Sequence, residues 1–132
     1  MKKIATKVLA LVMVCVCLAS CGAVTLESIF SSKAGQQQIE SMKDSVMNGF
    51  EDVYKDFEVK AEGNNLICNY YFTETYDEMK DQLKSSLPDS MNWEKEINNL
   101  KDEIEKSSKI RPDSVTYAYF TSTGEELFSV TK

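Results

Sequence analysis

The sequence predicts an α+β domain, in which a four-stranded antiparallel sheet made of two hairpins carries its helices mainly on one face. Two observations lead to this fold class. Segments with apolar residues at helical spacing precede each of two segments in which apolar and polar residues alternate on either side of a turn. The expected order is therefore helix, hairpin, a kinked or split helix, and hairpin. No crossover demanding parallel strands is expected, and the order of the strands is left open.

The first helical segment has two candidate starting points. Thr25 can cap a short helical turn with the sequence LESIF, and Ser31 or Ser32 can cap a longer helix after it. Gly35 and Gly49 leave the ends of that helix open. Its apolar residues recur at three-, four- and seven-residue spacing: Ile39, Met42, Val46 and Val53.

The first hairpin consists of residues 57–62, a turn at Gly63-Asn64-Asn65, and residues 66–73. Two registers satisfy the pattern, because a Gly63-Asn64 loop pairs Val59 with Cys68 and an Asn64-Asn65 loop pairs Val59 with Tyr70. Both registers give the same faces. The inner face holds Phe57, Val59, Cys68, Tyr70 and Phe72, and the outer face holds Glu58, Lys60 and Asn69, with Ile67 and Tyr71 as apolar exceptions.

The second helical segment opens on the pattern Thr75-x-x-Glu78, which predicts a capping box. Pro88 is expected to break or kink this helix, Ser90 can cap a new start, and Arg111-Pro112 ends the helical region. Two apolar stripes at helical spacing predict core contacts: Tyr76, Met79, Leu83 and Leu87, then Trp93, Ile97, Leu100 and Ile104.

The second hairpin reads VTYAYFTS, a Ser-Thr-Gly turn and EELFSVT, with Gly124 at the position that needs a positive φ. Its first strand is apolar on both faces, so one of Tyr119 and Phe120 must point away from the principal helices. Either helices cover both faces, or the outward residue joins Ile67 and Tyr71 in an exposed patch for a partner. The candidate patch residues are therefore Ile67, Tyr71, Tyr119 and Phe120.

The N-terminus carries the features of an export signal. Three lysines precede an uncharged run, Val8–Ala19, that is shorter than the about 20 residues a transmembrane helix needs. The end of the run and the two residues after it, Leu18, Ala19, Ser20 and Cys21, resemble a bacterial lipobox. That resemblance implies cleavage of residues 1–20 as a signal peptide and a diacylglycerol on the Cys21 thiol. Residues 21–132 then form a single domain behind a short tether.

Composition limits the partners of such a domain. Removing residues 1–20 leaves 112 residues and takes away three lysines and no acid, so the formal net charge changes from −6 to −9. An acidic surface repels phosphate backbones and anionic headgroups. We therefore expect no nucleic-acid partner, and contact with the cell membrane, on its extracytoplasmic side, only through the lipid on Cys21. Cys68 would be the single remaining thiol, unable to form an internal disulfide and best placed as a buried core residue.

The whole chain also resembles a known family. A lipobox, the segment TLES, a Gln-rich helix, VKAEGNNLICNYYF, TYDEMKDQLKSSL and VTYAYFTSTGEELFSVT follow one another in an order similar to that of the small Gram-positive lipoproteins grouped as domain of unknown function 4854. The resemblance implies no catalytic residues, because that family has no assigned activity.

The side chains that usually perform catalysis are scarce. The chain has no histidine and no Gly-rich phosphate loop, and its acids fall where helices face water. We therefore expect no enzyme, no cofactor and no metal. The leading hypothesis is a non-catalytic interaction module that binds a protein or envelope partner. The alternative is a small-ligand or solute-binding accessory of a transporter or sensor, which would need a deep pocket.

Overall fold

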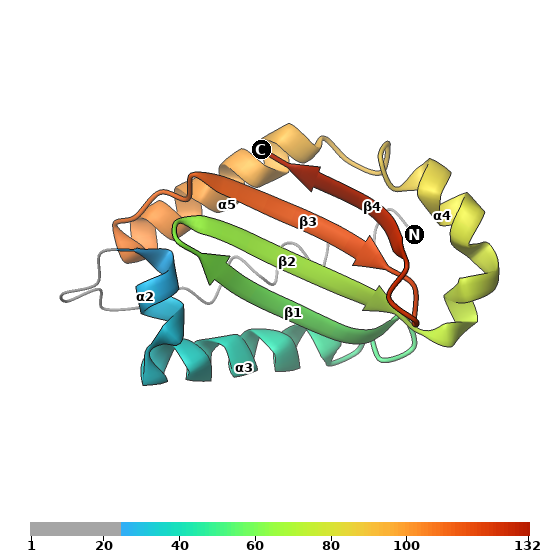
Figure 1. Cartoon of the computed structure of the whole chain (residues 1–132), viewed down its shortest axis with the longest axis horizontal. Helices are drawn as coiled ribbons and strands as arrows, with labels where there is room; N and C mark the ends of the chain where they lie inside the picture. The colour runs from blue at the N-terminus through green and yellow to red at the C-terminus, as the bar shows by residue number, and fades with distance from the viewer. Residues whose placement is uncertain (1–24) are drawn as a thin grey trace.

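The computed structural model describes residues 25–132 and contains one four-stranded sheet in the order β1-β2-β3-β4 (Figure 1). The predicted signal peptide, the predicted lipobox with Cys21 and the predicted tether lie outside the described residues. The elements are α2 (Leu26–Ser31), α3 (Lys33–Met47), β1 (Tyr54–Glu62), β2 (Asn65–Phe72), the 3-10 helix η1 (Glu74–Met79), α4 (Lys80–Ser86), α5 (Trp93–Ser108), β3 (Ser114–Phe120) and β4 (Glu126–Thr131).

Both caps expected in the first helical segment are confirmed. The Thr25 hydroxyl accepts a hydrogen bond from a backbone N–H in the first turn of α2, and the Ser32 hydroxyl accepts one from the backbone N–H of Gly35 at 3.0 Å. Gly35 is required by close packing, because a Cβ there would lie 2.0 Å from the backbone oxygen of Ile29. Val53 lies in the turn after α3, where it packs against the core without belonging to the helix.

The first hairpin takes one of the two registers that the sequence allows. Val59 pairs with Cys68 and Ala61 with Leu66, which is the alternative with the Gly63-Asn64 loop. The expected inner face is confirmed, since Phe57, Val59, Cys68, Tyr70 and Phe72 are all buried. Cys68 is fully buried, and burial raises the pKa of its thiol to about 12.

The expectation of a wholly antiparallel sheet is wrong at one place, because β3 lies parallel to β2 with Asn65 opposite Ser114 and Tyr71 opposite Phe120. The reason lies in the long connection between the two hairpins. Helices η1, α4 and α5 carry the chain from the end of β2 back to the end where β2 began, as a parallel pair requires. The helices expected as a covering layer are therefore also a crossover.

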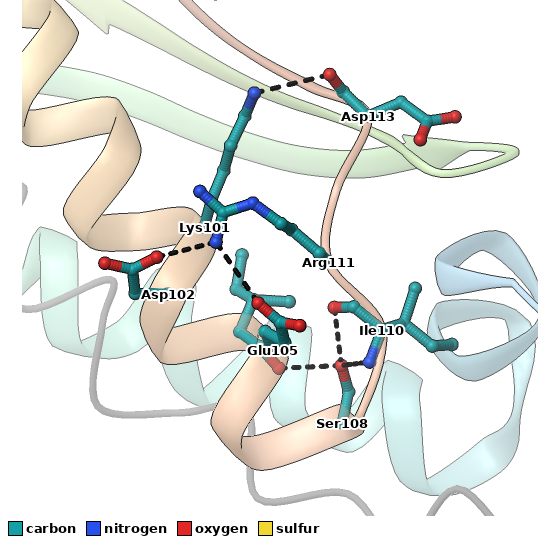
Figure 2. Close-up of polar contacts among 8 residues, drawn as sticks. Lys101, Asp102, Glu105, Ser108, Ile110, Arg111 and Asp113 are labelled. Carbon is teal, nitrogen blue, oxygen red and sulfur yellow. Dashed lines mark hydrogen bonds and ion pairs between the residues drawn. The ribbon is translucent and has the colours of Figure 1, made fainter.

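The last turn of α5 is tied to the chain that leads into β3 (Figure 2). The buried Ser108 hydroxyl donates to the backbone oxygen of Ile104 at 2.7 Å and accepts from the backbone N–H of Ile110 at 3.1 Å. Lys109 ends the helix in a left-handed conformation, with a φ of 66°. These contacts fix where the chain turns from the helix toward the sheet.

Charged side chains brace the same turn from outside. Arg111 donates to Asp102 at 2.6 Å and to Glu105 at 3.2 Å, and Lys101 donates to the backbone oxygen of Asp113 at 3.3 Å (Figure 2). The two carboxylates raise the pKa of Arg111 through hydrogen bonds, with Asp102 contributing most. The start of β3 is thereby held against α5, which lies along the inner side of the sheet.

Two start signals in the second helical segment are corrected by the structure. The capping box expected at Thr75 is absent, because a 3-10 helix begins at Glu74 and Thr75 lies inside it. The residue at the N-cap position is Thr73, and its side chain makes no capping hydrogen bond. The helix after Pro88 is capped by Asn92, whose side chain accepts from a backbone N–H of the first turn of α5. Ser90 instead donates its hydroxyl to the backbone oxygen of Leu87 at 2.7 Å.

The core of the domain lies between the sheet and its helices. The break expected at Pro88 is confirmed, and the buried members of the two expected stripes are Leu83, Leu87, Trp93, Ile97, Leu100 and Ile104. Trp93 meets Tyr117 and Phe128, with ring centroids 5.7 and 5.4 Å away. Gly124 has a φ of 93° in the turn of the second hairpin, as expected.

Candidate functional site

The face of the sheet turned away from the helices is the candidate site. Glu58 and Lys60 on β1 are exposed, whereas the residues that alternate with them are buried against the core. Figure 1 looks onto this side, with the strands in front and the helices behind or beside them. Within residues 25–132, no helix lies over this outer face, so the predicted arrangement with helices mainly on one face is confirmed.

An aromatic pair stands on the outer face. Tyr71 on β2 and Phe120 on β3 occupy opposite positions in the parallel register, and their rings stack with centroids 5.0 Å apart and planes 19° from parallel. Both side chains are half-buried. Because the two strands are parallel, residues 49 positions apart in sequence come into direct contact.

Tyr119 does not belong to the candidate patch. Its side chain is fully buried, and its ring stacks on Tyr70 with centroids 4.8 Å apart and planes 11° from parallel. Trp93 lies 6.0 Å from it, edge to face. Strand alternation sends Tyr119 inward once Tyr117 is in the core, and Phe120 therefore points outward.

Ile67 lies on the same face but nearer the start of β2. It is four residues before Tyr71, about 13 Å along the strand, and its register neighbours are Lys60 and Thr116. Ala118, which is 5% exposed, lies between the two ends of this apolar surface. We use the name outer-face patch for Ile67, Tyr71 and Phe120.

The Tyr71 hydroxyl forms a hydrogen bond with a residue of β1. It donates a hydrogen bond to a Glu58 carboxylate oxygen at 2.7 Å. This hydrogen bond is the main reason that the pKa of Tyr71 is raised to about 12. Tyr71 therefore remains a neutral phenol at neutral pH. Strand alternation predicts Glu58 on the outer face, but its contact with Tyr71 depends on the hairpin register, which the sequence leaves open.

A hollow of about 320 Å³ adjoins the aromatic pair and is lined by Lys55, Asp56, Glu58, Tyr71, Ser122, Thr123 and Gly124. Its charged groups are paired. Lys55 donates to the backbone oxygen of Ser122 at 2.9 Å, and Asp56 forms an ion pair with Lys43 at 2.9 Å. The hydrogen bond to Asp56 raises the pKa of Lys43. The side chains that line the hollow thus form a polar border next to the apolar Tyr71–Phe120 pair.

Asp77 in η1 clamps the loop between β3 and β4. It accepts hydrogen bonds from the hydroxyl and from the backbone N–H of Ser122, the latter at 3.0 Å. These two bonds lower the pKa of Asp77. The sequence does not predict this contact, because the two residues are 45 positions apart and no short-range pattern links them.

Three further observations concern the described part of the chain. Among residues 25–132, no group of three or more Cys, Asp or Glu side chains is arranged to hold a metal ion. None of the helices in that stretch combines the length and the apolar character that a bilayer span requires. A wider hollow of about 740 Å³ runs along α5, where charged side chains such as Asp102 and Lys106 line it.

Comparison with known proteins gives one match. The family model of a domain of unknown function, DUF4854, matches residues 26–131. No curated protein and no solved structure matches the chain. The match begins at the first residue of α2 and ends at the last residue of β4, so it includes every element of the sheet and its helices. The chain therefore belongs to the DUF4854 family.

Proposed function

We propose that this protein is a bacterial surface lipoprotein, anchored in the membrane through Cys21, whose folded domain is a non-catalytic interaction module. The anchor is supported by the order of features at the N-terminus: lysines, a short uncharged run, two small residues and Cys21. A single fatty chain gives only marginal membrane binding, whereas two chains anchor a protein stably. A diacylglyceryl group on Cys21 would therefore keep the domain at the membrane surface.

The uncovered outer face carries the proposed interaction. The stacked Tyr71 and Phe120 present aromatic surface on a face that no described helix covers. Aromatic side chains are enriched in protein interfaces, where an apolar centre is surrounded by a polar rim. The charged groups of the neighbouring hollow form such a rim.

The chemistry of the outer-face patch favours a protein partner over a glycan. The Tyr71 hydroxyl is engaged by Glu58, so the patch offers mainly C–H surface: an aliphatic side chain and two rings. A glycan needs many donors and acceptors for its hydroxyl groups, whereas apolar side chains of a protein need only a complementary surface.

The polar groups near the outer-face patch make hydrogen bonds and ion pairs within the domain. The Ser122 hydroxyl donates to Asp77, and the lowered pKa of Asp77 makes it a weak base. Lys55 is bound to a backbone oxygen and Asp56 to Lys43. These contacts support a binding role without catalysis.

The alternative, a solute-binding accessory of a transporter or sensor, finds less support. Small-molecule sites are usually enclosed and mostly apolar, with a few polar groups inside. The hollows beside Tyr71 and along α5 are open to solvent and are lined largely by charged and polar side chains.

A pull-down from native membranes tests the interaction. The lipidated protein serves as bait, together with Phe120→Ala and a matched control, Ser129→Ala, which changes an exposed residue of β4. We expect a polypeptide retained by the wild type and by Ser129→Ala to be lost with Phe120→Ala. A partner that binds all three baits equally, or bound material that consists of glycan alone, would contradict the proposal.

A further inference from the structure

We infer that the anchored domain stands with one end of its sheet next to the bilayer and with the Tyr71–Phe120 pair at the opposite end, facing the aqueous space. This inference rests on the proposed anchor at Cys21. It adds an orientation, and with it the side from which a partner approaches the outer-face patch. Three properties of the chain carry it: the length of the tether, the contacts of α2 and the direction of the strands.

The tether is short. Only three residues separate Cys21 from Thr25, so a fully extended chain between them spans at most about 14 Å. Thr25 is the N-cap of α2 and is followed directly by the folded domain. The first turn of α2 therefore has to stay close to the headgroup layer.

The first turn of α2 is fastened to one end of the sheet. The backbone N–H of Leu26 donates to the Asn64 side chain at 3.0 Å, and that of Glu27 donates to the backbone oxygen of Gly63 at 2.9 Å. The Glu27 carboxylate accepts from the Gly63 N–H at 2.8 Å in return. The turn between β1 and β2 is thus fixed beside the point where the tether joins the domain. We call this the tethered end of the sheet.

The start of β3 and the end of β4 also lie at the tethered end. The backbone N–H of Asp113 donates to the backbone oxygen of Asn64 at 2.8 Å, and Val115 and Lys132 exchange backbone hydrogen bonds of 3.0 and 3.2 Å. The parallel pairing of β3 with β2 makes this arrangement possible, since both strands start here and run away from it.

The aromatic pair lies at the other end. Tyr71 is six residues beyond Asn65 along β2, about 20 Å from the tethered end, and Phe120 is opposite to it on β3. The β3–β4 loop, with Thr123 and Gly124, lies next to it. Figure 1 shows α2 at one end of the strands and this loop at the other.

Charge opposes an arrangement in which the domain lies flat on the membrane. The chain from Cys21 onward has a formal net charge of −9, which an anionic lipid surface repels. With its tethered end within reach of the lipid and its remainder repelled, the domain projects outward. A protein partner then meets the Tyr71–Phe120 pair in the aqueous space, beyond the headgroups, and not within the bilayer.

Energy transfer to the membrane surface tests the orientation. Glu62→Cys places a thiol at the tethered end and Thr123→Cys places one at the far end, both at exposed positions. Each lipidated variant is labelled with the same donor dye and reconstituted in vesicles that contain a headgroup-labelled acceptor lipid. Cys68 does not interfere, because its thiol is fully buried and its pKa is raised to about 12.

We expect higher transfer efficiency from position 62 than from position 123. Equal efficiencies, or the reverse order, would overturn the orientation. A biotin at each position gives a second readout with a protein-sized probe. Streptavidin should bind the biotin at position 123 on intact vesicles and should lose binding at position 62, whereas equal access at both positions would contradict the inference. Failure of the anchor is distinguishable, because the protein would then not remain with the vesicles.

Discussion

The Tyr70 and Tyr119 rings lie side by side on two parallel strands, with centroids 4.8 Å apart, and both hydroxyls are buried without a hydrogen-bond partner among the described residues. A buried hydroxyl that lacks a partner costs about 1–3 kcal/mol. Contact between the rings therefore stabilises the folded state, whereas burial of the two unpartnered hydroxyls destabilises it.

Tyr119→Phe is expected to leave the free energy of unfolding unchanged or to raise it, because it removes an unpartnered hydroxyl and keeps the ring. Urea denaturation followed by circular dichroism measures the change. The matched control is Tyr71→Phe, which removes a hydroxyl that does have a partner, Glu58. A clear loss of stability with Tyr119→Phe would show that its hydroxyl has a partner in the folded protein.

Tyr119→Ala and Phe120→Ala should differ sharply, although the two residues are adjacent. Replacing a core aromatic by alanine costs about 3–5 kcal/mol, and Tyr119 is fully buried. Phe120 faces outward and is half-buried, so its replacement should cost about 1 kcal/mol. Thermal and urea unfolding of both variants measure the difference. Equal and large losses would mean that the outer face is covered in the native protein.

Gly35→Ala should destabilise the domain even though alanine favours helices more than glycine does. The added Cβ would meet the backbone oxygen of Ile29 at 2.0 Å, so α2 and α3 would have to move apart. Forcing an extra carbon into a packed contact costs about 1–3 kcal/mol. Gln37→Ala, at an exposed position in the same helix, is the control and should change little. Equal stability of both variants would contradict the close packing of these helices.

Glu58→Gln should lower the pKa of Tyr71 from about 12 toward its ordinary value of 10. The hydrogen bond to Glu58 favours the protonated phenol, so the folded state holds this proton more tightly than the unfolded state does. The resulting stabilisation is complete below about pH 10 and disappears as the pH rises through about 12. NMR titration of the Tyr71 ring in both proteins measures the shift. An unchanged pKa in Glu58→Gln would show that the Glu58 carboxylate is not the cause.

Cys21→Ala should abolish lipid labelling, and the protein should remain as uncleaved precursor or be released from the membrane. Incorporation of a labelled fatty acid and fractionation of the cells measure this. Cys68→Ala is the control, because Cys68 is buried in the sheet and should not affect labelling. A Cys21→Ala protein that still incorporates fatty acid and sediments with membranes would refute the lipid anchor.

The sequence predicts most of the local structure because local signals decide it. Thr25 and Ser32 cap the helices as expected, and Pro88 ends α4. The alternation around Gly63 gives the correct faces of the first hairpin. The prediction that Ser90 caps the helix after Pro88 is wrong, because Asn92, two residues later and an equally good capping residue, caps α5.

Long-range pairing is what the sequence does not reveal. The parallel contact of Tyr71 with Phe120 and the bond of Asp77 to Ser122 join segments that are far apart in the chain. Alternation shows that one of Tyr119 and Phe120 faces outward, but the choice between them depends on how β3 meets the helices. The candidate site was therefore predicted as a face, and the structure identifies Phe120 as its second aromatic residue.

The parallel crossover also affects the order in which the domain can be completed. Contacts within each hairpin join residues close in sequence and can form early, whereas the pairing of β2 with β3 must close a loop through residues 73–113. A chain that emerges from a membrane with its N-terminus first presents β1 and β2 long before β3. Until Ser114 and the strand that follows it have emerged, Tyr70 lacks the ring it stacks on and one edge of β2 is unpaired. If the domain is exported as proposed, it would be most prone to aggregation and proteolysis in the interval before residues 114–132 arrive.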